Sequence, residues 1–191
     1  DVVLHPKFAE NGLVYISYNK AASASPTAQS AVALGRGRFD GTAVTGFTEI
    51  FAGEMKDGNS GSRIAFGADG LLYLTTGAGN GMFAQEPSSV YGKVLRMRDD
   101  GSIPPDNPYL GRPGARPEVF SIGHRDQLGL AWHAASGSLL AADHGPNGGD
   151  EVNLVMARRN YGWPLSSYGR QYDGPRVSET PVADGIEQPL L

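Results

Sequence analysis

Short apolar runs recur along the whole chain and predict β-strands. Turns such as ENG, ADG, DDG and ASG separate many of these runs and supply residues that tolerate positive φ angles. No segment shows the capped amphipathic periodicity of a longer helix. The chain is therefore predicted to be all-β, with strands at 13–18, 31–39, 63–66, 71–77, 93–97, 128–132, 138–144 and 151–156.

Three segments repeat one layout of apolar strand, short turn with glycine, and second apolar strand. They are VVLHPKFAENGLVYISY, RIAFGADGLLYLTTG and GLAWHAASGSLLAADHG, with turn glycines Gly12, Gly70 and Gly137. Repeats of this kind, here roughly 60 residues apart, are typical of a β-propeller, in which each blade is a small antiparallel sheet. We therefore expect an incomplete arc of about three blades. A β-sandwich with long loops is the competing architecture.

The length suits a single domain, since the chain has 191 residues, with 27 Gly and 13 Pro. Pro/Gly-rich stretches at 99–117 and 164–181 are predicted to be long connections, because strand patterns continue on both sides. The chain starts inside one apolar run, DVVLHPKF, and stops as another begins, EQPLL. We expect residues 1–191 to be part of a single β-propeller domain that is truncated at both ends. A trimmed mature domain is the alternative.

Charge and motifs narrow the possible functions. The net charge is −4 and the Lys and Arg residues form no cluster, which argues against a nucleic-acid partner. The chain has no cysteine, which excludes disulfides and thiolate metal sites, and no apolar run approaches the ~18 residues of a membrane span. GxSxG, P-loop and HExxH motifs do not occur, and GAGNG at 77–81 lacks the βαβ context of a nucleotide loop.

The segment DHGPNGGDEVNLV at 143–155 carries the clearest candidate chemistry. Its glycines let the backbone turn sharply and bring carbonyl oxygens together, and hard cations such as Ca²⁺ prefer oxygen ligands. Asp150 and Glu151 follow directly, and adjacent strand residues point to opposite faces. These two acids are therefore expected to serve two sites. The alternative is a tight hairpin with two solvated acids.

Two further loops contain candidate binding residues. In SIGHRDQLGLAW, Arg125 lies between two predicted strands, and its planar guanidinium suits carboxylates. Asp126 could pair with Arg125 or with a metal, and an ordinary surface ion pair is the alternative. In GNSGSRIAFGADG, Asn59 precedes a strand and could donate hydrogen bonds to a ligand, although the sequence alone favours a simple Gly/Ser turn. His124 and His133 are expected to be packing or hydrogen-bonded residues.

Taken together, these loops resemble the soluble quinoprotein sugar dehydrogenases, also called glucose/sorbosone or aldose sugar dehydrogenases. The resemblance covers nearly the whole chain, and its most specific blocks are GLAWHAASGSLLAADHGPNGGDEVNLV and NYGWP. It implies a six-bladed β-propeller that uses pyrroloquinoline quinone (PQQ) and Ca²⁺. The implied activity is oxidation of aldoses at C1 to lactones, with hydride passed to the quinone and then electrons to an external acceptor. It also implies a periplasmic or secreted location.

The resemblance assigns roles to particular residues. Backbone carbonyls of Gly145 and Pro146 would hold the cofactor-side Ca²⁺, and Asp150 would lie near the cofactor. Arg125 would contact the reactive oxygen of the quinone. A second, structural Ca²⁺ site would take Glu151 and the carbonyl of Tyr161.

Three positions depart from the family pattern. The base of the family is a His four residues before a strand-starting Arg, and here that position is Asn59, whose amide has no useful basicity. Asp126 stands where the family usually has Asn, so it could weaken cofactor binding or replace the missing base. His144 stands where some members have Gln near the cofactor. A non-catalytic propeller of the same lineage, binding a carbohydrate or protein partner, is therefore the alternative function.

Overall fold

The protein is built from three antiparallel sheets, described by a computed structural model over residues 1–25, 28–58, 60–79 and 81–191. Within each sheet the strands pair in chain order, as in a propeller blade. The first sheet contains β1 (Val2–Leu4), β2 (Leu13–Ala21), β3 (Ser30–Phe39) and β4 (Val44–Ala52). The second contains β5 (Gly61–Phe66), β6 (Leu72–Thr76), β7 (Lys93–Met97) and β8 (Val119–Ile122). The third contains β9 (Gln127–His133), β10 (Ser138–Asp143) and β11 (Glu151–Val155).

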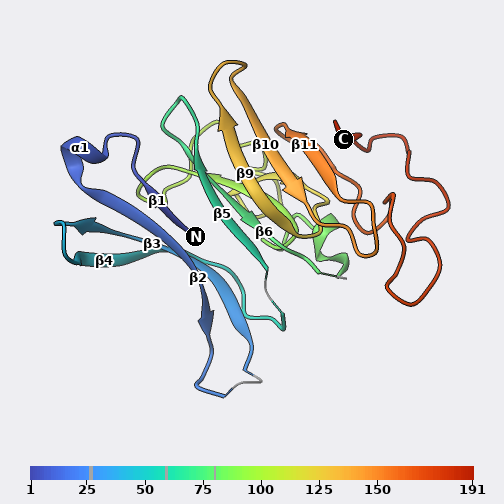
Figure 1. Cartoon of the computed structure of the whole chain (residues 1–191), viewed down its shortest axis with the longest axis horizontal. Helices are drawn as coiled ribbons and strands as arrows, with labels where there is room; N and C mark the ends of the chain where they lie inside the picture. The colour runs from blue at the N-terminus through green and yellow to red at the C-terminus, as the bar shows by residue number, and fades with distance from the viewer. Residues whose placement is uncertain (26–27, 59, 80) are drawn as a thin grey trace.

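The middle sheet is covered on both faces, which explains why every residue of β6 and β7 is buried. Leu72 and Leu74 pack toward Tyr15 of the first sheet, whereas Tyr73 packs toward Leu139 of the third. This division follows from the strand period of two, which sends alternate side chains to opposite faces. The sheets therefore stand side by side in an open arc (Figure 1), whereas a two-layer sandwich would bury one face of each sheet.

The repeated glycines occupy equivalent turns. The turns that lead into β2, β6 and β10 contain Gly12, Gly70 and Gly137, whose φ angles are 63°, 77° and 64°. A left-handed backbone of this kind suits glycine, which has no Cβ to clash. The repeat in the sequence thus marks the first hairpin of each sheet.

Helix is scarce, as predicted. The described residues contain one short α-helix, α1 (Phe8–Asn11), and one 3₁₀ turn, η1 (Met82–Gln85). None of the helices in the described part of the chain is long or apolar enough to cross a membrane. The Pro/Gly-rich stretches at 99–117 and 164–181 contain no named strand.

One edge of the second and third sheets gathers the candidate site. Because the strands are antiparallel, the starts of β5, β7, β9 and β11 and the ends of β6, β8 and β10 meet there. We call this the site edge. The connection from β8 to β9 contains Arg125 and Asp126, and the connection from β10 to β11 contains residues 144–150. The topology therefore brings the two predicted loops to the same place.

Candidate functional site

The loop at 145–149 is a packed corner. Gly145 and Pro146 are buried, and Gly148 and Gly149 have φ angles of 74° and 72°. A Cβ at Gly145 would lie 2.2 Å from the Gly148 carbonyl oxygen, and one at Gly149 would lie 2.4 Å from the Gly169 nitrogen. Glycine is required at both positions because backbone segments approach each other so closely. A solvated hairpin does not describe this loop.

The two acids after this loop have different surroundings. Asp150 is exposed, and its Oδ1 accepts the Gly145 N–H at 2.8 Å, which closes the corner. Glu151 is half-buried, and its Oε2 accepts a hydrogen bond from Asn153 Nδ2 at 3.0 Å. Burial, with a smaller contribution from the nearby Asp143 carboxylate, raises the pKa of Glu151 to about 7. A cation beside Glu151 would favour its ionised form.

A small cavity lies between this loop and the segment behind it. Its volume is about 10 Å³, which matches a single water molecule or ion. Among the described residues, no three His, Asp or Glu side chains group in a way that could hold a metal. Any cation here would therefore depend on backbone oxygens as well as on carboxylate, which is the donor set that suits Ca²⁺. The lining includes Asp143, His144, Gly145, Glu151 and Tyr161.

Tyr161 is held rigidly beside this cavity. Its hydroxyl donates to the Leu154 carbonyl at 2.5 Å and accepts the Met156 N–H at 2.9 Å. Burial raises the pKa of Tyr161 to about 12, so the phenol stays neutral. The NYGWP turn is thereby fixed against β11. Asn153 Oδ1, on the same strand, is buried with no hydrogen-bond partner among the described residues.

Arg125 is buried at the site edge and bonds the loop directly. Its Nη1 lies 3.0 Å from His144 Nδ1 and donates to the carbonyl oxygens of His144 at 2.8 Å and Gly145 at 3.2 Å. Its guanidinium lies 5.2 Å from the Trp163 ring centroid and 5.9 Å from that of Tyr172. No hydrogen bond to Asp126 is found in the described part of the chain, so the expected alternative of a surface ion pair does not describe Arg125. A buried guanidinium beside aromatic rings is suited to a planar anionic ligand.

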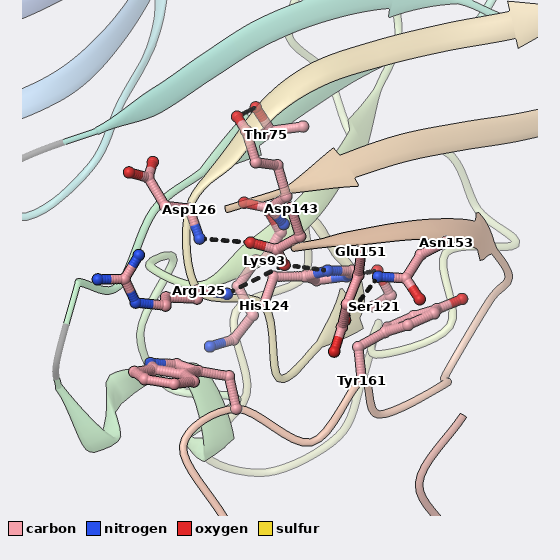
Figure 2. Close-up of polar contacts among 12 residues, drawn as sticks. Thr75, Lys93, Ser121, His124, Arg125, Asp126, Asp143, Glu151, Asn153 and Tyr161 are labelled. Carbon is pink, nitrogen blue, oxygen red and sulfur yellow. Dashed lines mark hydrogen bonds and ion pairs between the residues drawn. The ribbon is translucent and has the colours of Figure 1, made fainter. Parts of the chain in front are cut away.

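Figure 2 shows the Asp126 carboxylate apart from the Arg125 guanidinium, and it lies close to Gly77, which directly follows β6. Its Oδ1 is buried and has no hydrogen-bond partner among the described residues. A Cβ on Gly77 would lie 3.1 Å from this oxygen and 2.1 Å from Ser60 Oγ, so the three groups converge. Asn59, the predicted neighbour of this spot, lies outside the described residues.

The structure brings most of the predicted residues together. Arg125, His144, Gly145, Glu151 and Tyr161 line one cavity. Asp150 lies on the outer side of the same loop, where it lines a second pocket with His144 and Glu151.

Sequence reasoning missed other members of the site. Asp143 accepts a hydrogen bond from the backbone of the β8–β9 connection. Trp163 and Tyr172 lie beside the Arg125 guanidinium. An acid at the end of an apolar strand, as in LLAAD, was a signal that could have identified Asp143.

Comparison with known proteins finds relatives that match over the whole chain. The chain is 37% identical over 197 residues to the aldose sugar dehydrogenase YliI of Escherichia coli, covering 100% of this chain and 53% of the relative. A crystal structure of a glucose dehydrogenase superposes with a TM-score of 0.92 at 36% identity, covering 100% of this chain and 56% of that one. This likeness confirms the propeller-type fold. The chain spans about half the length of the curated relatives that it matches most extensively.

A relative with bound cofactor has also been solved. The PQQ-bound form of an aldose sugar dehydrogenase from Streptomyces coelicolor superposes with a TM-score of 0.73 at 32% identity, covering 98% of this chain and 51% of that one. The family model described as "Glucose / Sorbosone dehydrogenase" matches residues 1–191. The chain therefore belongs to the glucose/sorbosone dehydrogenase family.

Proposed function

We propose that the protein containing this chain oxidises aldose sugars at C1 to lactones, with PQQ and Ca²⁺ bound at the site edge. The observation that carries the proposal is the buried Arg125 guanidinium, which donates to the loop carbonyls and lies over two aromatic rings. Family membership and a PQQ-bound relative support the choice of cofactor. When bound, the quinone supplies the acceptor for the hydride that leaves C1, and an external acceptor then takes the electrons.

The loop at 145–149 is the proposed source of backbone ligands for Ca²⁺. Gly145 and Pro146 are buried, and the corner they form is closed by the bond from the Gly145 N–H to Asp150. We assign their carbonyl oxygens to the cofactor-side cation. Arg125, with His144 and Asp150 nearby, would bind and orient the anionic quinone and stabilise negative charge that develops on it. The buried position of Arg125 strengthens this effect because water screens it less.

A second Ca²⁺ would be held at the Glu151 and Tyr161 end of the same cavity. Glu151 would supply a carboxylate that burial disfavours as an anion, and Tyr161, whose side chain is hydrogen-bonded to β11, would supply its backbone carbonyl. The cavity between them is of ionic size. This cation would brace the NYGWP turn against β11 and would have a structural role.

Asp126 is the candidate for the base that removes the proton from the C1 hydroxyl. As the C–H bond breaks and the hydride leaves, the O–H proton passes to the Asp126 carboxylate and the C1=O bond forms. The free buried oxygen of Asp126 and its position beside Gly77 and Ser60 support this assignment. Asn59 is an amide and cannot accept the proton.

The amide at position 59 also favours a second candidate function. A propeller without an effective base could keep the Ca²⁺ framework and use the site edge to bind a carbohydrate or a protein. Such a protein would not turn over sugar.

An activity assay distinguishes the two functions. The full-length protein is loaded with PQQ and Ca²⁺, and reduction of an artificial dye is followed when an aldose is added. The enzyme proposal predicts dye reduction that depends on both the sugar and Ca²⁺ and is lost in Arg125→Met. Arg38→Met, at an exposed position on β3, is the matched control. Loaded protein that reduces no dye with any aldose would support the binding function instead.

A further inference from the structure

Asp143 lies at the end of β10 and is only 7% exposed, although it is an acid. Its two oxygens accept hydrogen bonds from two consecutive peptide groups. Oδ2 accepts the Arg125 N–H at 3.1 Å, and Oδ1 accepts the Asp126 N–H at 2.6 Å (Figure 2). Both residues of the β8–β9 connection that carry candidate chemistry are therefore held through their backbone by one carboxylate.

The strand register explains why a side chain is needed there. β9 and β10 pair regularly from Ser138 to Ala142, and the register then shifts so that Asp143 lies opposite Gln127. The shift is a β-bulge, which bends the strand and interrupts the backbone ladder. The amides of Arg125 and Asp126 lie beyond this interruption, and buried amides require a partner. The Asp143 carboxylate is that partner.

A buried group supports the carboxylate from behind. His124 Nδ1 lies 3.4 Å from Asp143 Oδ2, and His124 Nε2 lies 2.9 Å from Ser121 Oγ. The imidazole also stacks on the Tyr161 ring at 4.4 Å. Burial lowers the pKa of His124, even though Asp143 opposes this effect, so the ring is neutral at neutral pH.

These residue types match those of a serine hydrolase triad, but their burial points to another role. Ser121 and His124 are both 0% exposed, so a substrate cannot reach the hydroxyl. The imidazole therefore packs against Asp143 from the core side. On the other side, the His144 N–H donates to the Asp126 carbonyl at 3.0 Å.

We propose that Asp143 is the positioning residue of the site, which sets the directions of Arg125 and Asp126 by binding both of their peptide N–H groups. One carboxylate thereby fixes the group that binds the anionic cofactor and the candidate base relative to each other. The consequence for catalysis rests on the proposed function, whereas the positioning itself does not.

Amide hydrogen exchange in the full-length protein tests the positioning directly. Asp143→Asn keeps the size of the side chain but turns one acceptor into an NH₂ donor that faces a peptide N–H. We expect exchange at Arg125 and Asp126 to be at least ten-fold faster in this variant, with the amides of β10 and β11 as internal reference. Asp143→Glu, which keeps both acceptors, should give an intermediate rate. Asp184→Asn, at an exposed position, should match the wild type.

The outcomes separate this inference from the proposed function. Unchanged exchange at Arg125 and Asp126 in Asp143→Asn overturns the inference, and so does faster exchange spread evenly over the whole sheet. If Asp143→Asn does not fold, amide exchange in Asp143→Glu is compared with the wild type instead. Unchanged exchange at Arg125 and Asp126, or faster exchange spread evenly over the sheet, then overturns the inference.

A parallel PQQ titration should show weaker binding in Asp143→Asn by at least ten-fold and partial recovery in Asp143→Glu. Wild-type protein that binds no PQQ contradicts the proposed function while the exchange result still stands. Unchanged PQQ affinity with faster local exchange contradicts only the link from positioning to cofactor binding.

Discussion

At the scale of single residues, two positions decide whether the site is an efficient catalyst. Under the proposed function, Asn59 takes the position of the family's base, and Asp126 has a buried oxygen with no hydrogen-bond partner among the described residues. An amide has no lone pair of useful basicity, whereas a carboxylate accepts protons readily. The chemistry of these two positions therefore sets the expected turnover.

Asn59→His should raise the turnover of the PQQ-loaded, full-length protein by at least ten-fold, which is about 1.4 kcal/mol of activation free energy. The imidazole would supply a base with a pKa near neutrality. The measurement is kcat with a saturating aldose, with cofactor loading checked by absorbance. An unchanged kcat in fully loaded protein would show that the base is not limiting.

Asp126→Asn should lower kcat by at least ten-fold, because general-base assistance is typically worth about 10²–10⁴ in rate. The double variant Asn59→His/Asp126→Asn should recover activity, since it supplies a base at the other position. Asp184→Asn is the matched exposed control. A loaded Asp126→Asn protein that turns over sugar at the wild-type rate excludes Asp126 as the base.

The sequence was enough to single out loop residues that the structure brings together, but not a residue that binds backbone groups, such as Asp143. Arg125, Gly145 and Glu151 stand out because charge and glycine are concentrated in two loops. The role of Asp143 depends on a register shift between β9 and β10, and no pattern in the sequence marks where a ladder slips. Tyr172 lies in a segment of coil, so its approach to Arg125 depends on tertiary packing.

At the scale of elements, strands were predictable where their side chains are buried. β6 and β7 contain the apolar runs LYL and VL because both faces of the middle sheet are covered. β4 was missed because most of its residues are exposed and give no apolar signal. β1 was predicted only as the first apolar strand of the repeat, and β8 was missed because it is short. Burial, rather than strand formation itself, is what the apolar pattern reports.

Lys93 on β7 is hydrogen-bonded to η1, and its ionisation is expected to make the stability of the protein depend on pH. It is fully buried, and its Nζ donates to the carbonyls of Phe83 at 2.5 Å, Tyr91 at 2.6 Å and Ala84 at 3.0 Å. Burial lowers the pKa of Lys93 to about 7. The three carbonyl acceptors oppose this effect, because a neutral amine has only two N–H donors.

Between about pH 7 and 10.5, the unfolded chain keeps the proton on Lys93 more fully than the folded chain does. The free energy of unfolding should therefore rise with pH in this window, by at most about 1.4 kcal/mol per pH unit. Below this window Lys93 is protonated in both states and should contribute nothing to the pH dependence. Urea unfolding of the full-length protein at pH 7, 8 and 9 measures the slope. Lys93→Met should remove this contribution, and an identical slope in the variant would contradict the assignment.

At the scale of the whole molecule, the arrangement of sheets creates the site. The repeat of turn glycines was enough to predict blades, because each hairpin has the same local chemistry. The arc places the starts and ends of neighbouring strands at one edge, so loops from two sheets converge there (Figure 1). Residues far apart in sequence, such as Gly77 and Asp126, thus become neighbours.

The central claim is that Arg125 and the carbonyls of the 145–149 loop together bind a quinone with Ca²⁺. Calorimetric titration of PQQ into the full-length protein tests it most directly, with Ca²⁺ present or removed by a chelator. The account predicts saturable binding with Ca²⁺, at least ten-fold weaker binding in Arg125→Met or without Ca²⁺, and wild-type binding in Arg38→Met. PQQ binding that is absent in the wild type, or that is unaffected by both Arg125→Met and chelation, would contradict it.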